Sequence, residues 1–427
     1  MMLMANTKGR LRLHGSKLAP LLLLLTTIPL SFFIVVGTLY VVQPELLWGP
    51  QRRPGAGALL TQQDAIENKS PEAVGRKAEL ERLWDIQWSY SGISTFAHLK
   101  HVSCLTEPDT PFDIGIIGAP FDTAVSYRTG ARFGPRAIRT ASARQSRSRG
   151  WNPRAKINPY KSGLTIVDCG DIPLMPLDNG VALRQMTQAM TELGSRPSAR
   201  RGTRQQRRPR LLTLGGDHSV TLGALRALRQ VHGQPLTVLH FDAHLDTWIP
   251  PANAEQFAWF SEQGRFNHGD VFTFAWNEGL IANGSSVHVG LRTRLSGPED
   301  NEDDAKQGFA QIAADEVDGI GVEGIVGKVK ARVGDGPVYL SFDIDVVDPG
   351  LAPGTGTPEV GGFTSREVIR MLRGLQGVDV VGADIVEVNP AYDGRGEQTA
   401  LVAAQVAFEI LTNWAMSDEA SSSQDKT

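Results

Sequence analysis

Short apolar segments alternate with longer amphipathic ones along most of the chain, from about residue 72 onward. The short segments are rich in β-branched and aliphatic residues and predict strands, whereas the longer ones show the spacing of helices. The predicted strands are 112–118, 164–167, 211–214, 237–241, 286–289, 338–342 and 380–386, and the predicted helices include 181–193, 220–231, 321–333, 365–375 and 399–414. This order predicts an α/β domain whose mostly parallel sheet is covered by helices on both faces.

The beginning of the chain has a different pattern. Residues 18–42 contain no charged side chain and are long enough to span a bilayer, and a cluster of basic residues precedes them. Under the positive-inside rule this predicts a basic cytosolic tail (1–17), a transmembrane anchor (18–42) and a catalytic domain in the lumen or outside the cell. The alternative is a cleaved signal sequence, which would place a secreted protein in the same secretory pathway.

Polar segments border the predicted catalytic domain, residues 72–416. Residues 43–71 are rich in Gly, Pro, Gln and Arg and predict a flexible stalk, and residues 417–427 predict a disordered tail. Residues 196–210 hold seven arginines between a predicted helix and a predicted strand. Such a charge run indicates an exposed insertion, with a docking patch for acidic partners or lipid headgroups as the alternative.

Cysteine content and net charge exclude two other classes of protein. With only Cys104 and Cys169, the chain is not built on a disulfide framework, and the sequence leaves open whether the two residues pair. The formal net charge of −3 gives no basis for nucleic-acid binding.

Three acidic blocks in the second half of the chain each follow a predicted strand. They are GGDHS (215–219), FDAHLD (241–246) and SFDID (341–345). An ionised carboxylate at the end of an apolar strand is costly to bury unless its charge is compensated. Because ligands bind at the carboxyl ends of the strands in such sheets, we expect the blocks to meet there. The sequence therefore predicts a metal site, and with it an enzyme.

Six side chains in these blocks are potential metal ligands. They are His218, Asp242, His244, Asp246, Asp343 and Asp345. Alternate side chains of an extended segment share one side, which brings together the ligands within the second block and within the third. Four carboxylates and two imidazoles suit Mn²⁺, with zinc and cobalt as alternatives. The set over-supplies one ion, whereas two ions sharing bridging carboxylates would use all six.

The blocks resemble the signatures of the ureohydrolase family, the arginases and agmatinases. The resemblance rests on GGDHS, FDAHLDTW and SFDIDVVDP, and it extends over roughly residues 80 to 415 through weaker matches such as YRTGARFGPRAIR, VDCGDIP and GADIVEVNP. It implies a three-layer α/β/α domain with two Mn²⁺ ions per subunit that hydrolyses a guanidino group to urea and an amine. It also implies a homo-oligomer, either a trimer or a hexamer.

The resemblance also implies a role for each residue. One ion would be bound by His218, Asp242, Asp246 and Asp343, and the other by His244, Asp242, Asp343 and Asp345. Asp246 would also accept a proton from the attacking water and pass it to the leaving amine.

Three further residues complete the expected site. Glu387 matches the glutamate that holds the guanidinium, and a carboxylate suits the forked donors of that planar cation. His268 matches the histidine that protonates the product amine. Asp217 is expected to orient the loop rather than to bind metal.

The segment after Asp246 bears on the substrate. It lacks the Asn- and Ser-bearing stretch of arginases, and FNHG (266–269) resembles the agmatinase branch, which implies agmatine as substrate and putrescine as product. Asp270 replaces the small hydroxyl residue usual in agmatinases and could select a cationic tail. The aromatic-bearing residues 248–265 could instead admit another end group, such as the carboxylate of 4-guanidinobutyrate.

Arginase activity and hydrolysis of other guanidino acids are the alternatives within the family. From other classes, the alternatives are a single-zinc deacetylase and an inactive, membrane-tethered binding module. The ligands for a second ion, His218, Asp246 and Asp345, argue against the deacetylase, and the intact set of six ligands with Glu387 and His268 argues against the inactive module.

Overall fold

The computed structural model describes residues 76–86, 88–200, 208–250 and 266–424. These divide into two units, of which the first ends at Asp85 and contributes helix α2 (Arg76–Trp84). The second unit, from Ile86 onward, holds the sheet and the other helices. The predicted tail, anchor and stalk, residues 1–71, lie outside the described residues, and the predicted boundary at residue 72 stays a prediction.

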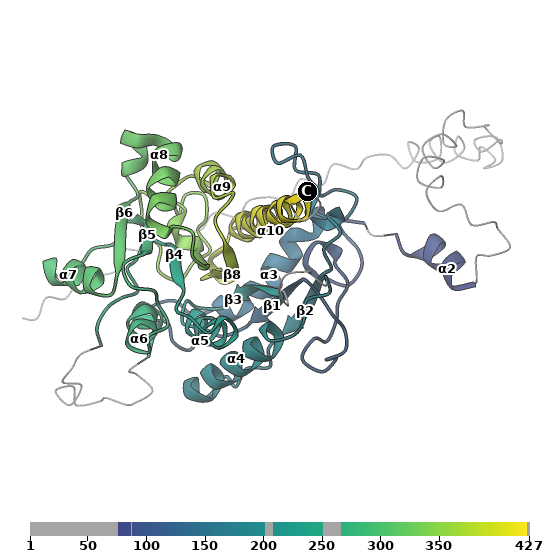
Figure 1. Cartoon of the computed structure of the whole chain (residues 1–427), viewed down its shortest axis with the longest axis horizontal. Coiled ribbons are helices and arrows are strands. Elements are labelled where there is room, and N and C mark those ends of the chain that lie inside the picture. The colour runs from purple at the N-terminus through teal and green to yellow at the C-terminus, as the bar shows by residue number, and fades with distance from the viewer. Residues whose placement is uncertain (1–75, 87, 201–207, 251–265, 425–427) are drawn as a thin grey trace, which may run out of the picture. The chain divides into compact units, whose positions relative to one another are not determined.

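Eight parallel strands form one sheet at the centre of the second unit (Figure 1). The strand order is β2-β1-β3-β8-β7-β4-β5-β6. The strands are β1 (Ile114–Ala119), β2 (Ile166–Asp171), β3 (Arg210–Gly215), β4 (Thr237–Phe241), β5 (Ser286–Leu291), β6 (Phe309–Ala313), β7 (Val338–Asp343) and β8 (Val380–Val386). Most strand positions are buried, as expected for a parallel sheet covered on both faces.

Helices cover both faces of the sheet and give it two hydrophobic cores. In Figure 1, α4, α5 and α6 lie on one side and α8, α9 and α10 on the other. The helices of the second unit are α3 (Gly134–Ala141), α4 (Asn179–Gly194), α5 (Val220–His232), α6 (Val271–Asn277), α7 (Pro298–Lys306), α8 (Glu316–Val333), α9 (Ser365–Gly374) and α10 (Gln398–Gln424). The predicted three-layer α/β/α architecture with a parallel sheet is confirmed.

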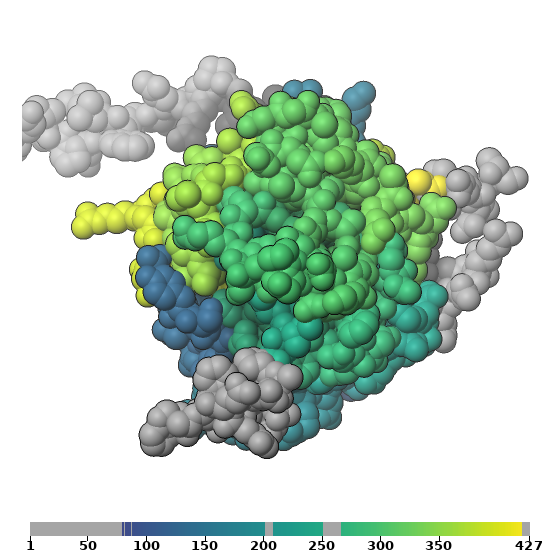
Figure 2. Space-filling model, turned by 90° about the vertical axis from the view of Figure 1, so that its left-hand side faces the viewer, coloured from purple at the N-terminus to yellow at the C-terminus, as the bar shows by residue number. Residues whose placement is uncertain are grey.

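The strand that the sequence did not predict, β6, forms one edge of the sheet. Only Phe309 and Ile312 are buried in it, and the polar, exposed Gln311 interrupts its apolar run. Helix α7 precedes it and packs against it. Figure 2 views the molecule from this side, where residues coloured green form most of the surface.

The chain order of the strands determines where the acidic blocks meet. After β3 the chain passes through α5 and enters the sheet again at β4, which leaves a gap that β7 and β8 fill later. The carboxyl ends of β3, β8, β7 and β4 therefore lie side by side at the middle of the sheet. Such a reversal in strand order is where open α/β sheets bind their ligands.

The end of the chain differs from the sequence expectation, and the two cysteines answer a question that the sequence left open. Helix α10 continues to Gln424, whereas residues 417–427 were predicted to be a disordered tail. The reason is that Trp414 packs in the core and Asp418 is buried, with an ion pair to Arg200 from the arginine-rich segment. Cys104 and Cys169, whose pairing the sequence left open, form a disulfide.

Candidate metal centre and substrate pocket

Four neighbouring strand ends bring the predicted site residues together. His218 follows β3, Asp242 follows β4, Asp343 ends β7 and Glu387 follows β8. All four are at most 2 % exposed. Residues from distant parts of the sequence therefore meet in one buried place, because parallel pairing aligns the ends of β3, β8, β7 and β4.

His218 lies at the centre of the first group of potential ligands. Its Nδ1 lies 3.1 Å from Asp242 Oδ2, 2.9 Å from Asp246 Oδ2 and 3.2 Å from Asp343 Oδ2. Its Nε2 lies 2.8 Å from the Ser341 hydroxyl, which fixes the ring so that Nδ1 points at the carboxylates. One nitrogen facing three carboxylate oxygens is the arrangement expected around a cation.

His244 lies at the centre of the second group. Its Nδ1 lies 3.2 Å from Asp242 Oδ1 and 3.0 Å from Asp345 Oδ2. Asp242 thus contributes one oxygen to each group, as a bridging ligand would. Asp345 is held by Ala243, whose N–H donates to Asp345 Oδ1 at 3.2 Å.

The electrostatics of these groups are unfavourable without a cation. Burial and the charges of Asp345 and Asp242 raise the pKa of Asp343 well above its usual value, and burial together with Asp242 raises that of Asp345 to about 6. Burial also disfavours ionised Asp242, yet the neighbouring histidines hold its pKa well below the usual value.

Two buried atoms in the first group lack a hydrogen-bond partner, namely Nδ1 of His218 and Oδ2 of Asp242. Buried carboxylates without compensation are costly, and such donor sets normally coordinate metal. The six predicted ligands therefore fit divalent cations, and their oxygen–nitrogen mixture suits manganese.

Two site residues adopt backbone conformations that are strained for their type. Asp246 has φ 53° and Glu387 has φ 59°, in the left-handed region that side chains with a Cβ rarely occupy. Neighbouring backbone bonds hold both residues: Phe272 N–H donates to Asp246 O at 3.0 Å, and Glu387 N–H donates to Gly216 O at 2.8 Å. Strain of this kind persists where surrounding structure enforces it, and it is concentrated at functional sites.

Glu387 and His268 form a buried pair beside the metal ligands. Glu387 Oε1 accepts from the backbone N–H of His218 and lies 2.9 Å from His268 Nδ1, whereas Oε2 has no partner. Burial disfavours the charged imidazole, but the hydrogen bond and charge of Glu387 outweigh it and raise the pKa of His268 to about 9. Ser126 N–H donates to the other ring nitrogen at 3.0 Å, which favours the neutral ring and opposes this rise.

Asp217 stabilises the loop before α5 from within. Its carboxylate accepts hydrogen bonds from the backbone N–H groups of Ala124 and Ser219, at 3.1 Å each, and from the Ser219 hydroxyl. Burial and the charge of Glu387 raise its pKa to about 7. These contacts join two loops near the strand ends.

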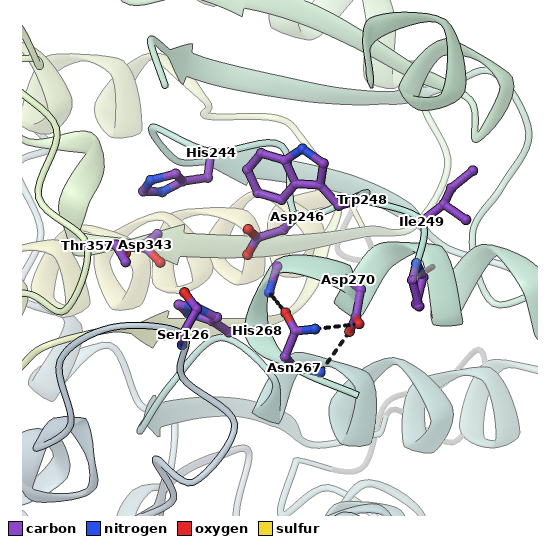
Figure 3. A pocket seen from close by; sticks show the side chains of 12 residues that line it. Ser126, His244, Asp246, Trp248, Ile249, Asn267, His268, Asp270, Asp343 and Thr357 are labelled. Carbon is purple, nitrogen blue, oxygen red and sulfur yellow. Dashed lines mark hydrogen bonds between the residues drawn. The ribbon is translucent and has the colours of Figure 1, made fainter. Parts of the chain in front are cut away.

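A cavity of about 390 Å³ opens over the ligand cluster. In Figure 3, His244 and Asp246 lie on one side of it, and Ser126 and His268 on the other. The described lining residues are Ser126, His244, Asp246, Trp248, Ile249, Pro250, Asn267, His268, Gly269, Asp270, Asp343 and Thr357, and none of them is a lysine or an arginine.

Asp270 is the acidic residue of this lining that belongs neither to the ligand cluster nor to the Glu387–His268 pair. It is 2 % exposed and accepts from the backbone and side-chain N–H groups of Asn267 at 2.9 and 2.7 Å (Figure 3). Burial, with a contribution from the charge of Asp246, raises its pKa to about 7. Residues 251–265, which hold most of the aromatic insertion, lie outside the described residues.

Sequence reasoning missed two residues of the site. His240 Nε2 lies 2.8 Å from Asp242 Oδ2, and the period of two along β4 places both side chains on one side, so the alternation that grouped Asp242 with Asp246 could have found it. Ser126, whose Oγ lies 2.7 Å from His268 Nε2, precedes the YRTGARFGPRAIR segment. A lone serine before a loop carries no comparable signal.

Comparison with known proteins identifies the family. The model of the arginase family matches residues 112–412. "Putative agmatinase 3" of Schizosaccharomyces pombe is 48 % identical over 333 residues, covering 76 % of this chain and 80 % of that protein. Guanidinobutyrase of Pseudomonas aeruginosa is 37 % identical over 325 residues, covering 75 % of this chain and 92 % of the enzyme.

A solved structure shows the same fold. Proclavaminate amidinohydrolase of Streptomyces clavuligerus superposes with a TM-score of 0.67 at 37 % identity, covering 77 % of this chain and 99 % of the other. With the buried Asp/His cluster already described, these matches define the class of protein as a ureohydrolase with a candidate metal site. The chain belongs to the arginase family, and its type is that of the agmatinases.

The predicted location of the protein is wrong. The apolar residues 18–42 predict a membrane anchor or signal sequence and thus a protein of the secretory pathway. Across the stretches of chain that the structure describes, no helix combines the length and apolar character needed to cross a bilayer. The matching agmatinases also give no support for a membrane-anchored or secreted enzyme. The apolar composition of one segment was too weak a basis for the assignment.

Proposed function

We propose that the protein is a binuclear manganese hydrolase that cleaves agmatine to urea and putrescine. The observation that carries this proposal is the pair of ligand groups around His218 and His244, which share Asp242 and lie beside a glutamate with one unpartnered, buried oxygen. The first ion would be held by His218, Asp242, Asp246 and Asp343. The second would be held by His244, Asp242, Asp343 and Asp345.

The residues of the pocket can bind and orient a guanidinium. Glu387 Oε2 is buried and unpartnered, and a planar cation with several N–H donors can satisfy it. Because Oε1 already accepts from His218 N–H and contacts His268, the carboxylate is held in one orientation before substrate binds. The guanidinium carbon would then lie between Glu387 and the ligand cluster.

Proton transfer can be assigned to two side chains. When bound, the cations supply the charge that makes water a competent nucleophile near neutral pH. Asp246 accepts the proton that the attacking water loses, and His268 passes a proton to the leaving nitrogen. One water is consumed, the bond between the guanidinium carbon and the substituted nitrogen breaks, and the products are urea and a protonated amine.

The charge of the described pocket favours a substrate with a cationic tail. Asp270 provides a carboxylate, and the described lining contains no lysine or arginine to bind a substrate carboxylate. This favours agmatine over the guanidino acids. Hydrolysis of 4-guanidinobutyrate is the second candidate, because the guanidinobutyrase of Pseudomonas aeruginosa aligns over most of its length.

Urea release by the purified full chain with Mn²⁺ tests the proposal. The substrates to compare are agmatine, arginine, 4-guanidinobutyrate and 3-guanidinopropionate, and we expect agmatine to give the highest kcat/KM. Absence of urea from all four would refute the hydrolase assignment, and preference for a guanidino acid would refute the agmatine assignment. Elemental analysis should find about two manganese ions per chain, whereas a single zinc would point to the deacetylase alternative.

A further inference from the structure

Helix α7 carries one buried carboxylate that the proposed reaction does not use. The helix sequence, PEDNEDDAK, is highly charged, and the helix lies at the β6 edge of the sheet (Figure 1). Asp304 is nevertheless fully buried, while its neighbour Asp303 is partly exposed and pairs with Lys306 at 2.7 Å. Burying a charge costs free energy, so the contacts of Asp304 call for an explanation.

Three polar side chains surround the Asp304 carboxylate. Oδ1 lies 2.8 Å from His288 Nε2 and accepts from the Thr247 hydroxyl at 2.8 Å, while Oδ2 accepts from Gln311 Nε2 at 2.8 Å. Burial disfavours the ionised form, but these contacts, led by His288, lower the pKa of Asp304 below its usual value. The carboxylate is therefore charged and fixed in position.

The first connection runs from Asp304 to the start of the second acidic block. His288 Nδ1 lies 2.7 Å from His240 Nδ1, and His240 Nε2 lies 2.8 Å from Asp242 Oδ2. Asp304, His288, His240 and Asp242 are all fully buried. His288 is thus held at both nitrogens and His240 at Nδ1, whereas Nε2 of His240 makes a close contact with Asp242 Oδ2 that is not a hydrogen bond. The orientation of His240 beside Asp242 therefore depends on the residues behind it.

The second connection reaches the other end of the block. Thr247 directly follows Asp246, whose backbone is in the left-handed region. The Thr247 hydroxyl donates to Asp304, and the Thr247 carbonyl accepts from Gln307 Nε2 at 2.8 Å and from the Thr273 hydroxyl at 2.7 Å. Asp304 of α7 and Gln307, which directly follows α7, therefore hold Thr247 in place next to the strained Asp246.

We propose that Asp304 is a positioning residue that holds both ends of the 242–246 block, through His288 and His240 at Asp242 and through Thr247 at Asp246. The role is more than packing, because both connections lead to proposed metal ligands. The inference rests on the proposed function only in so far as Asp242 and Asp246 are called metal ligands. The geometric claim concerns the block itself and holds for the metal-free protein.

Hydrogen exchange of the metal-free full chain tests this claim directly. We expect Asp304→Ala to speed amide exchange across residues 242–248 by about tenfold or more, as for a local opening made easier by a lost buried contact. Thr247→Val, which keeps the shape and removes one hydrogen bond, should speed exchange at the Asp246 end alone. Asp303→Asn is the matched control and should leave exchange of this block unchanged.

Manganese binding and kinetics provide the second readout. We expect Asp304→Ala to weaken Mn²⁺ binding by about tenfold or more, as loss of an outer partner of a metal ligand does. The same variant should lower kcat with little change in KM. Asp304→Asn, whose side-chain oxygen can still accept from Thr247 and His288, should restore most of the Mn²⁺ affinity and most of kcat.

Unchanged exchange at 242–248 in both Asp304→Ala and Thr247→Val would overturn the proposal. A lower melting temperature of Asp304→Ala with unaltered exchange of the block and unaltered Mn²⁺ affinity would also overturn it, because the role would then be purely structural. If the wild-type chain itself bound no manganese, the proposed function would fail, while the exchange data would still decide whether Asp304 holds the block.

Discussion

Replacing Glu387 with glutamine isolates the charge that acts on His268. Glu387 Oε1 accepts from His218 N–H and lies within hydrogen-bond distance of His268 Nδ1, each at 2.9 Å. The side-chain carbonyl of glutamine can accept the same two bonds, so the variant keeps the geometry and removes the negative charge. Any change in the pKa of His268 then reports the electrostatic contribution of the Glu387 carboxylate.

The expected magnitude follows from the pKa of His268. Burial lowers this pKa, and Glu387, followed by the charges of Asp246 and Asp217, raises it from the usual 6.5 to about 9. That interval corresponds to roughly 3 kcal/mol, at about 1.4 kcal/mol per pH unit. Without the charge, burial and the Ser126 N–H both favour the neutral ring, so we expect the pKa of His268 to fall from about 9 toward 6.5 in Glu387→Gln.

The same shift determines how stability depends on pH. Because the pKa of His268 is raised in the folded protein, its stabilising contribution is fully present below pH 6.5 and is lost as the pH rises through about 9. The free energy of unfolding of the metal-free wild type should therefore decrease over this window by up to about 3 kcal/mol relative to Glu387→Gln.

Nuclear magnetic resonance of the metal-free full chain measures both quantities. The histidine Cε1 protons are titrated, and the signal absent from His268→Asn identifies His268. Urea unfolding at the two ends of the pH window then gives the difference in stability. A pKa of His268 that stays near 9 in Glu387→Gln would refute the pairing, as would equal pH dependence of unfolding in the two proteins.

Three further outcomes follow from the structure. Asp343→Asn removes the charge of a carboxylate that belongs to both proposed ligand sets and lies 3.2 Å from His218 Nδ1. It should lower bound manganese from about two ions per chain to one or fewer, measured by elemental analysis after dialysis. Because burial raises the pKa of Asp270 to about 7, KM for agmatine should rise as the pH falls through about 7. Asp270→Asn should raise KM by roughly 10- to 100-fold and abolish that pH dependence. An unchanged KM in this variant would contradict a role of Asp270 in binding the substrate. Arg139→Met removes the guanidinium that donates two hydrogen bonds to Asp168, and leaves that buried carboxylate with backbone N–H partners but no counter-charge. It should destabilise folding by roughly 3–5 kcal/mol in urea unfolding, with partial recovery in Arg139→Met/Asp168→Asn.

The central strands could be predicted from sequence, and the edge of the sheet could not. Strands β3, β4 and β7 read as short, mostly apolar runs because their side chains are buried on both faces, and acidic residues stand at or just after their ends. Strand β6 lies at the edge and is only partly buried, so a polar residue, Gln311, interrupts its apolar run. Helix α7 shows no apolar face, and nothing in its sequence distinguishes the buried Asp304 from its four other acidic residues.

The positions of the site residues were predictable only in part. Their residue types and their places after strands predicted which side chains would meet, because parallel strands align their ends. The left-handed backbone at Asp246 and Glu387 was not predictable, since neither residue type requires it and tertiary contacts impose it. The partners of Asp304 lie on β5 and β6 and in the loop after β4, and no spacing within α7 indicates them.

The strain at Asp246 and Glu387 and the repulsion among the buried carboxylates act together on the metal-free fold. A left-handed conformation costs roughly 1–2 kcal/mol for a residue with a Cβ, and Asp343 and Asp345 resist ionisation beside Asp242. Cations that relieve this repulsion would bind the folded chain in preference to the unfolded one and so stabilise it. A variant that loosens the ligand block should therefore lose part of this added stability, even where its metal-free stability is normal. Unfolding measured with and without manganese separates residues that hold the site from residues that hold the fold.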